Sequence, residues 1–277
     1  MPVHPSPKPR PGPSLRLVPP APTDKGAARG GLPQHLAFLR DRLRRDLAGR
    51  SHHAATAVLP FGDARVDGCL PGGGLPLGAL HEVAASGRGA ETGELQAAFA
   101  AVLLGRIGPR KKVLWVAPVA DLYPPGLPGL DPSRLILASP RDDAGVLAAM
   151  ETGLREGGLA AVVGEIAGWG AAGARVASRR LVFACEQHAG TGFVLRRFPY
   201  GRAREDRQVS AAATRWLLAP APSGQWRVEL EQARGGRPGA WLMEVADDET
   251  NPLRVVAALA DHAAAPVADP KQAAGYG

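Results

Sequence analysis

Short apolar runs and helical patterns alternate over the middle of the chain. Runs of apolar residues bounded by Gly, Pro or charge predict strands at 79–83, 112–117, 134–138, 159–164 and 191–196. Apolar residues at three- and four-residue spacing predict helices at 93–107, 143–156 and 171–188. This alternation of strand and helix predicts an α/β protein with a mainly parallel sheet flanked by helices on both faces.

The pattern changes in the last third of the chain. Apolar runs at 214–219, 225–233 and 240–245 are joined by the Gly/Pro turns PAPSG and RGGRPG, with no helical pattern between them. Strands joined in this way predict antiparallel strands appended at the C-terminal side of the sheet. We therefore expect a core over residues 57–246, followed by a flexible tail over the Ala-, Asp- and Pro-rich segment 247–277.

Two segments of different character precede the core. Residues 1–31 are dominated by Pro, Gly and charge, which predicts a disordered tail because such a segment buries too little apolar surface to offset chain entropy. Residues 32–50 carry leucines at helical spacing with arginines between them, which predicts an amphipathic helix arm. The arm could pack on its own domain or dock on a partner, and its sequence fits both.

Composition narrows the class of protein. The 277 residues include 33 Lys and Arg against 26 Asp and Glu, and the net charge of +7 favours acidic partners such as nucleic acid. Cys69 and Cys185 have no CxxC or Cys/His spacing, so we expect no metal site, no disulfide framework and a cytoplasmic location. Since no run of about 18 apolar residues occurs, no membrane partner is expected.

The turn before the first predicted helix has the form of a phosphate-binding loop. The candidate loop residues are Ser86, Gly87, Arg88, Gly89, Glu91, Thr92, Gly93 and Glu94. The glycines permit a tight turn and the hydroxyls could face a ligand, but the lysine of a working loop is missing. A carboxylate a few ångström from a triphosphate repels it by about 4 kcal/mol per charge pair at an effective dielectric of 20. No cofactor is therefore expected, although Arg88 could replace the lysine in part.

A second feature of nucleotide sites is an acid at the end of a buried strand. The run LAAVVGE ends on Glu165, where such an acid orients a magnesium ion. The same carboxylate could instead cap the following turn, and the sequence leaves both interpretations open.

The order of several tracts resembles the RecA superfamily and, within it, the ImuA family. These tracts span most of residues 59–245 and read LPFGDARVDGCLPGGGLPLGALHEV, RRLVFACEQHAGTGFVLR, AAATRWLLAPAPS and WRVELEQARGGRPGAWLMEV. The resemblance implies a RecA-like core and a noncatalytic accessory protein of damage-inducible translesion DNA synthesis and mutagenesis. It also implies an ImuB-like polymerase adaptor and an error-prone polymerase as partners, with RecA, single-stranded DNA and self-association as further candidates.

Two other functions remain open at the level of sequence. The chain could be a divergent RecA-fold ATPase in which Arg88, or a basic residue of another chain, replaces the missing lysine. It could also be a regulator that inhibits a recombinase filament or a division protein without contacting DNA.

A basic stretch with aromatic residues, RRFPYGRAREDRQ, has the chemistry of a DNA contact. Arginines track phosphates while aromatic faces stack on bases. The candidate contact residues are Arg196, Arg197, Phe198, Tyr200, Arg202, Arg204 and Arg207. In RecA-type cores the corresponding loop faces single-stranded DNA, so the resemblance supports this role. A solvated loop would have the same composition, and that alternative stays open.

Two further features raise the question of protein partners. Arg175, Arg179 and Arg180 on the helix predicted at 171–188 could form a partner-facing surface or be simply exposed. Trp169 lies in the Gly-rich turn AGWGAAG, where it could be an exposed anchor for another protein. The other tryptophans lie mostly in predicted strands and are expected in the core.

Overall fold

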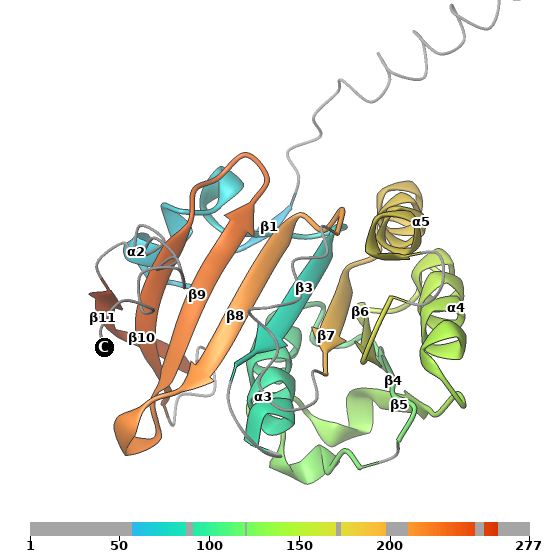
Figure 1. Ribbon diagram of the computed structural model, residues 1–277, viewed down its shortest axis with the longest axis horizontal. Helices are drawn as coiled ribbons and strands as arrows, with labels where there is room; N and C mark the ends of the chain where they lie inside the picture. The colour runs from blue at the N-terminus through green and yellow to red at the C-terminus, as the bar shows by residue number, and fades with distance from the viewer. Residues whose placement is uncertain are drawn as a thin grey trace, which may run out of the picture. The chain divides into compact units, whose positions relative to one another are not determined.

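The computed structural model describes residues 57–86, 91–119, 121–169, 173–197, 210–246 and 252–259 (Figure 1). The described part opens with a small antiparallel pair, β1 (Val58–Leu59) and β2 (Leu75–Pro76). Between these two strands lie α2 (Ala64–Asp67) and the 3-10 turn η1 (Pro71–Gly73). The tail and the arm expected at 1–31 and 32–50 lie outside the described residues and stay predictions.

One nine-stranded sheet forms the centre of the domain, in the order β11-β10-β9-β8-β3-β7-β6-β4-β5. Its strands are β3 (Leu80–Ala85), β4 (Val113–Val116), β5 (Leu135–Ala138), β6 (Ala161–Ile166), β7 (Gly192–Arg196), β8 (Thr214–Pro220), β9 (Trp226–Ala233), β10 (Gly239–Val245) and β11 (Leu253–Leu259). The strands from β8 to β5 are parallel, whereas β9, β10 and β11 are each antiparallel to their neighbours. The expected parallel sheet with appended antiparallel strands is confirmed.

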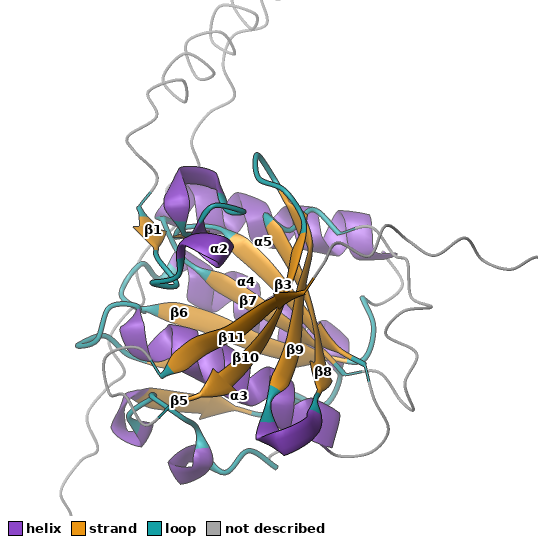
Figure 2. Cartoon of the chain, turned by 90° about the vertical axis from the view of Figure 1, so that its left-hand side faces the viewer, coloured by secondary structure: helices purple, strands orange, loops and turns teal. Residues whose placement is uncertain are grey.

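Helices cover both faces of this sheet, as predicted (Figure 2). Helix α3 (Glu91–Arg106) packs on one face, while α4 (Asp143–Arg155) and α5 (Gly173–His188) pack on the other. Short 3-10 turns complete the connections at η2 (Pro124–Gly126), η3 (Pro132–Arg134) and η5 (Pro222–Gly224). No helix within the described ranges is long and apolar enough to cross a membrane.

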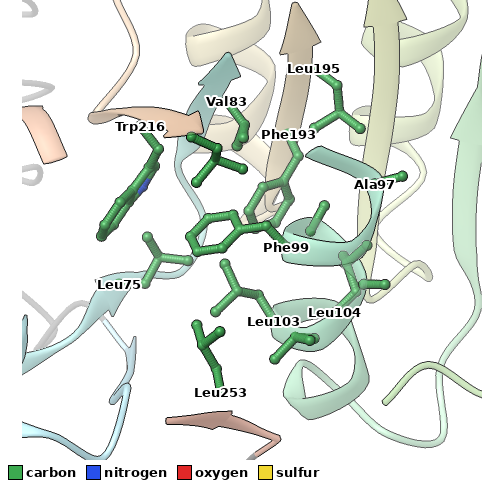
Figure 3. Close-up of a cluster of buried hydrophobic side chains, with 14 of the residues drawn as sticks. Leu75, Val83, Ala97, Phe99, Leu103, Leu104, Phe193, Leu195, Trp216 and Leu253 are labelled. Atoms are coloured by element: carbon green, nitrogen blue, oxygen red, sulfur yellow. The ribbon is translucent and has the colours of Figure 1, made fainter. Parts of the chain in front are cut away.

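Aromatic side chains form the centre of the core beneath α3. Figure 3 shows Phe99 of α3 lying between Phe193 of β7 and Trp216 of β8. The ring centroids of Phe99 and Trp216 are 5.5 Å apart, and both side chains are fully buried. Such contacts explain why most of α3 is apolar, because its central residues are buried against the sheet.

The C-terminal tail predicted from residue 247 is wrong for residues 253–259. These residues form β11, which pairs antiparallel with β10, and Leu253 is only 5% exposed. The short apolar run LRVVAAL is surrounded by Ala, Asp and Pro, so its own composition gives little indication of a strand. Pairing with β10 and burial against the core stabilise it instead.

His81 in the centre of β3 is completely buried and fully hydrogen-bonded. Its Nε2 donates to the Pro76 carbonyl at 2.9 Å, and its Nδ1 lies 2.8 Å from the Thr214 hydroxyl. The Thr214 oxygen already accepts a hydrogen bond from Trp216 Nε1, so its proton is directed to the neutral imidazole. Burial lowers the pKa of His81 to about 4, although the bond to Pro76 opposes this shift.

This burial predicts a pH-dependent stability. Between pH 6.5 and 4 the unfolded chain binds a proton at His81 that the native state does not bind, so unfolding becomes easier as the pH falls. The contribution of His81 is fully present above pH 6.5, and about 3 kcal/mol of it is lost by pH 4. Urea unfolding at a series of pH values measures this loss. His81→Gln should flatten the profile between pH 7 and 5, whereas the exposed His188→Gln should leave its slope unchanged.

Candidate functional site

The carboxyl ends of β3, β6 and β7 meet beside the first turn of α3, and open α/β sheets bind their ligands at this end of the strands. Of the phosphate-loop residues, Gly87, Arg88, Gly89 and the side chains of Glu91 and Thr92 lie outside the description. The Ser86 hydroxyl donates to the carbonyl of Leu218 at 3.3 Å, so it is bonded to strand β8. Glu94 is exposed on α3.

Arg197, directly after β7, brings a guanidinium to this site. Its Nη2 lies 2.8 Å from Asp121 Oδ2, and its Nη1 lies 3.1 Å from Glu165 Oε2. A Cβ placed on Gly93 would be 3.6 Å from Nη2, so the guanidinium lies against the first turn of α3. The hydrogen bond from Arg197 holds the pKa of Asp121 below its usual value, and the same bond raises the pKa of Arg197.

Both oxygens of Glu165 are bonded within this cluster. Trp115 Nε1 donates to Oε1 at 2.6 Å, and Oε2 faces Arg197. Burial raises the pKa of Glu165, while the Trp115 bond and the charge of Arg197 lower it in part. The turn-capping role, one of the two interpretations left open for Glu165, belongs instead to Asp143, which accepts from the backbone N–H groups of residues 167 and 168 at 3.2 and 2.8 Å. That alternative for Glu165 is therefore wrong.

A second carboxylate lies deeper, in the middle of β3. Glu82 is 4% exposed; its Oε1 lies 3.2 Å from Arg196 Nη1 and its Oε2 lies 3.4 Å from Arg215 Nη2. The Ser210 hydroxyl donates to the same Oε2. Arg196 and Ser210 lie on either side of the segment 198–209 in the sequence, so one carboxylate bonds residues from both flanks of that segment.

The prediction that Arg196 contacts DNA is wrong, because its side chain is only 2% exposed and is paired with Glu82. The prediction that Trp169 is an exposed anchor is also wrong. Trp169 is 2% exposed, and the guanidinium of Arg196 lies 5.3 Å from the centroid of its ring. The glycines around Trp169 suggested an exposed turn. The indole is instead buried in the core cluster of α4 and α5, in contact with the guanidinium of Arg196.

The remaining candidates divide into two groups. Phe198, Tyr200, Arg202, Arg204 and Arg207 lie outside the described residues and stay predictions. Arg175, Arg179 and Arg180 are exposed on α5, as their pattern allowed.

Sequence reasoning missed Glu82, Ser210 and Asp121 as parts of this site. A signal for Glu82 existed, because a charged residue inside the apolar strand LHEVAA must be paired when both faces of the strand are covered. Asp121 and Ser210 had no comparable signal, since short polar residues in loops are common. Only the folded arrangement brings them to Arg197 and Glu82.

The charged side chains at this site are already paired with one another. Two carboxylates, Asp121 and Glu165, face the one guanidinium of Arg197, so this cluster repels rather than attracts a phosphate. No group of three or more potential metal ligands occurs among the residues that the structure describes. Both cysteines are free and buried, and burial raises the pKa of the Cys185 thiol to about 12, which makes it a poor nucleophile.

The sheet order and the placement of the helices define a RecA-like α/β protein. Among solved structures, the RadB recombinase matches with a TM-score of 0.50 and 21% identity, covering 70% of this chain and 98% of that one. No family model matches the chain. Protein ImuA from two strains of Caulobacter vibrioides is 46% identical over 228 residues, covering 75% of this chain and 92% of the relative. The chain belongs to the ImuA family, which confirms the resemblance found in its sequence and connects it with damage-inducible mutagenesis.

Proposed function

We propose that this chain is a noncatalytic RecA-like accessory protein of translesion DNA synthesis that scaffolds an ImuB-like adaptor and an error-prone polymerase. Family membership supports the setting. The observation that carries the noncatalytic part is the closed cluster at the start of α3, where Asp121 and Glu165 hold Arg197. RecA and single-stranded DNA are further partners within this proposal, with the segment 198–209 as the DNA contact.

The rival function, a divergent ATPase, requires a cation that is available to phosphate. Arg197 lies at a suitable place, but using it would break two ion pairs and leave the buried Glu165 carboxylate facing Trp115 without its guanidinium. Leaving such a buried charge uncompensated costs several kcal/mol. The missing lysine in the segment 86–93 points in the same direction.

We therefore expect no measurable binding or hydrolysis of ATP. Titration of a fluorescent ATP analogue with magnesium should show no saturation up to about millimolar concentration, which corresponds to a binding free energy weaker than about 4 kcal/mol. A matched variant, Glu165→Gln, removes one opposing charge at nearly the same side-chain size, although its one carbonyl oxygen can replace only one of the two acceptors of Glu165. Micromolar binding by the wild type, weakened by Arg197→Ala, would contradict this expectation, and phosphate release from ATP would then establish the ATPase alternative.

A further inference from the structure

Helix α5 carries a surface that the RecA-like core does not use. Val176 and Phe183, each 54% exposed, are seven residues apart and therefore lie on the same side of the helix. Arg175, Arg179 and Arg180 are exposed beside them. We call these five residues the α5 outer face. Two large apolar side chains framed by arginines are a composition typical of the centre of a protein interface.

One arginine of the α5 outer face forms an ion pair with the neighbouring helix α4. Arg180 Nη2 lies 2.5 Å from Glu151 Oε2 of α4, and Arg155 Nη2 lies 2.5 Å from the other oxygen of the same carboxylate. Glu151 is thus neutralised by two arginines. Arg175 and Arg179 form no ion pair with the rest of the described chain, and Glu186, one turn beyond Phe183, is the nearby exposed acid of α5. A positive excess remains on this surface.

We infer that the α5 outer face binds an acidic amphipathic helix of the ImuB-like adaptor. Carboxylates on such a helix would pair with Arg175 and Arg179, while its apolar side chains would cover Val176 and Phe183. This charge complementarity selects the occupant. A second copy of the chain would bring like charges together across a two-fold interface. A nucleic acid could stack a base on Phe183, but it has no aliphatic side chains to pack on Val176, whereas an amphipathic helix covers both.

The inference rests on the proposed scaffold function, and one binding experiment separates the two. Full-length chain and purified ImuB-like adaptor from the same bacterium are titrated by calorimetry at about 50 and about 300 mM salt. Arg175→Glu with Arg179→Glu, and separately Val176→Ala with Phe183→Ala, should each weaken binding by about tenfold or more. The charge variant should also lose most of the salt dependence, because its attraction to the acidic helix is gone.

Matched controls change the same residue types elsewhere. Arg110→Glu lies in the exposed turn before β4, and Ile136→Ala with Leu137→Ala changes residues 45% and 52% exposed on β5. Both should bind the adaptor within about twofold of wild type, with melting curves confirming that every variant folds.

The outcomes are distinct. Wild-type affinity in both α5 variants would overturn the inference and leave the scaffold function standing, whereas no adaptor binding by the wild type would overturn both. If the α5 variants abolish instead a self-association seen by sedimentation, or the binding of an unstructured oligonucleotide, the occupant is a second copy or nucleic acid and the inference is wrong.

Discussion

Replacing Glu82 with alanine is expected to lower the free energy of unfolding by about 3–5 kcal/mol. The reason is the burial of its partners: the Arg196 side chain is 2% exposed and that of Arg215 is 18% exposed, and both guanidiniums face this carboxylate. Removing one member of a buried ion network leaves the opposite charges in a medium that solvates them poorly. Urea unfolding at neutral pH, followed by tryptophan fluorescence, measures the change.

A surface pair of the same chemistry provides the control. Glu244 and Arg254 form an ion pair in which the arginine side chain is 69% exposed, so Glu244→Ala should cost less than about 1 kcal/mol. A double-mutant cycle of Glu82→Ala with Arg196→Ala then isolates the coupling between the two groups. Equal small losses for Glu82→Ala and Glu244→Ala would show that the network around Glu82 contributes nothing beyond a surface pair.

The Glu82 network also illustrates what the sequence could and could not predict. Strands β3, β6 and β7 and helices α3, α4 and α5 follow from runs and spacings of apolar residues, because burial on a sheet or a helix face imposes those periods. The appended antiparallel strands β8, β9 and β10 follow from the turns between them. These features depend on residues close together in the chain, so local patterns suffice.

The site depends on residues that are far apart in the chain. Glu82 meets Ser210 and Arg215, and Arg197 meets Asp121, only because β3, β7 and β8 are neighbours in the sheet. The composition of RRFPYGRAREDRQ indicated a basic exposed loop for all of its arginines. The structure divides that stretch, since Arg196 still belongs to β7 and points into the core. A charge pattern cannot show where a strand ends relative to a buried partner.

Ending the chain at Ala246 is expected to remove at least about 4 kcal/mol of stability and to leave little folded protein, although the composition of residues 247–277 predicts a dispensable tail. Without β11 the backbone of β10 becomes an open sheet edge. The side chain of Leu253, which points into the core near Leu103, would also be lost (Figure 3). Burial of one leucine in a core contributes about 2–5 kcal/mol.

A chain ending at residue 260 keeps β11 and serves as the matched control, with an expected melting temperature close to that of the full chain. Because the chain ending at Ala246 could be insoluble, point variants measure the contribution of β11 to stability in the full-length chain. Leu253→Ala should destabilise by about 2–4 kcal/mol, while Val256→Ala on the same strand, where the side chain is 42% exposed, should change stability by less than about 0.5 kcal/mol. If the Leu253 and Val256 variants unfold at the same urea concentration, β11 is not part of the folding core, and the tail expected from composition would be the correct description of this segment.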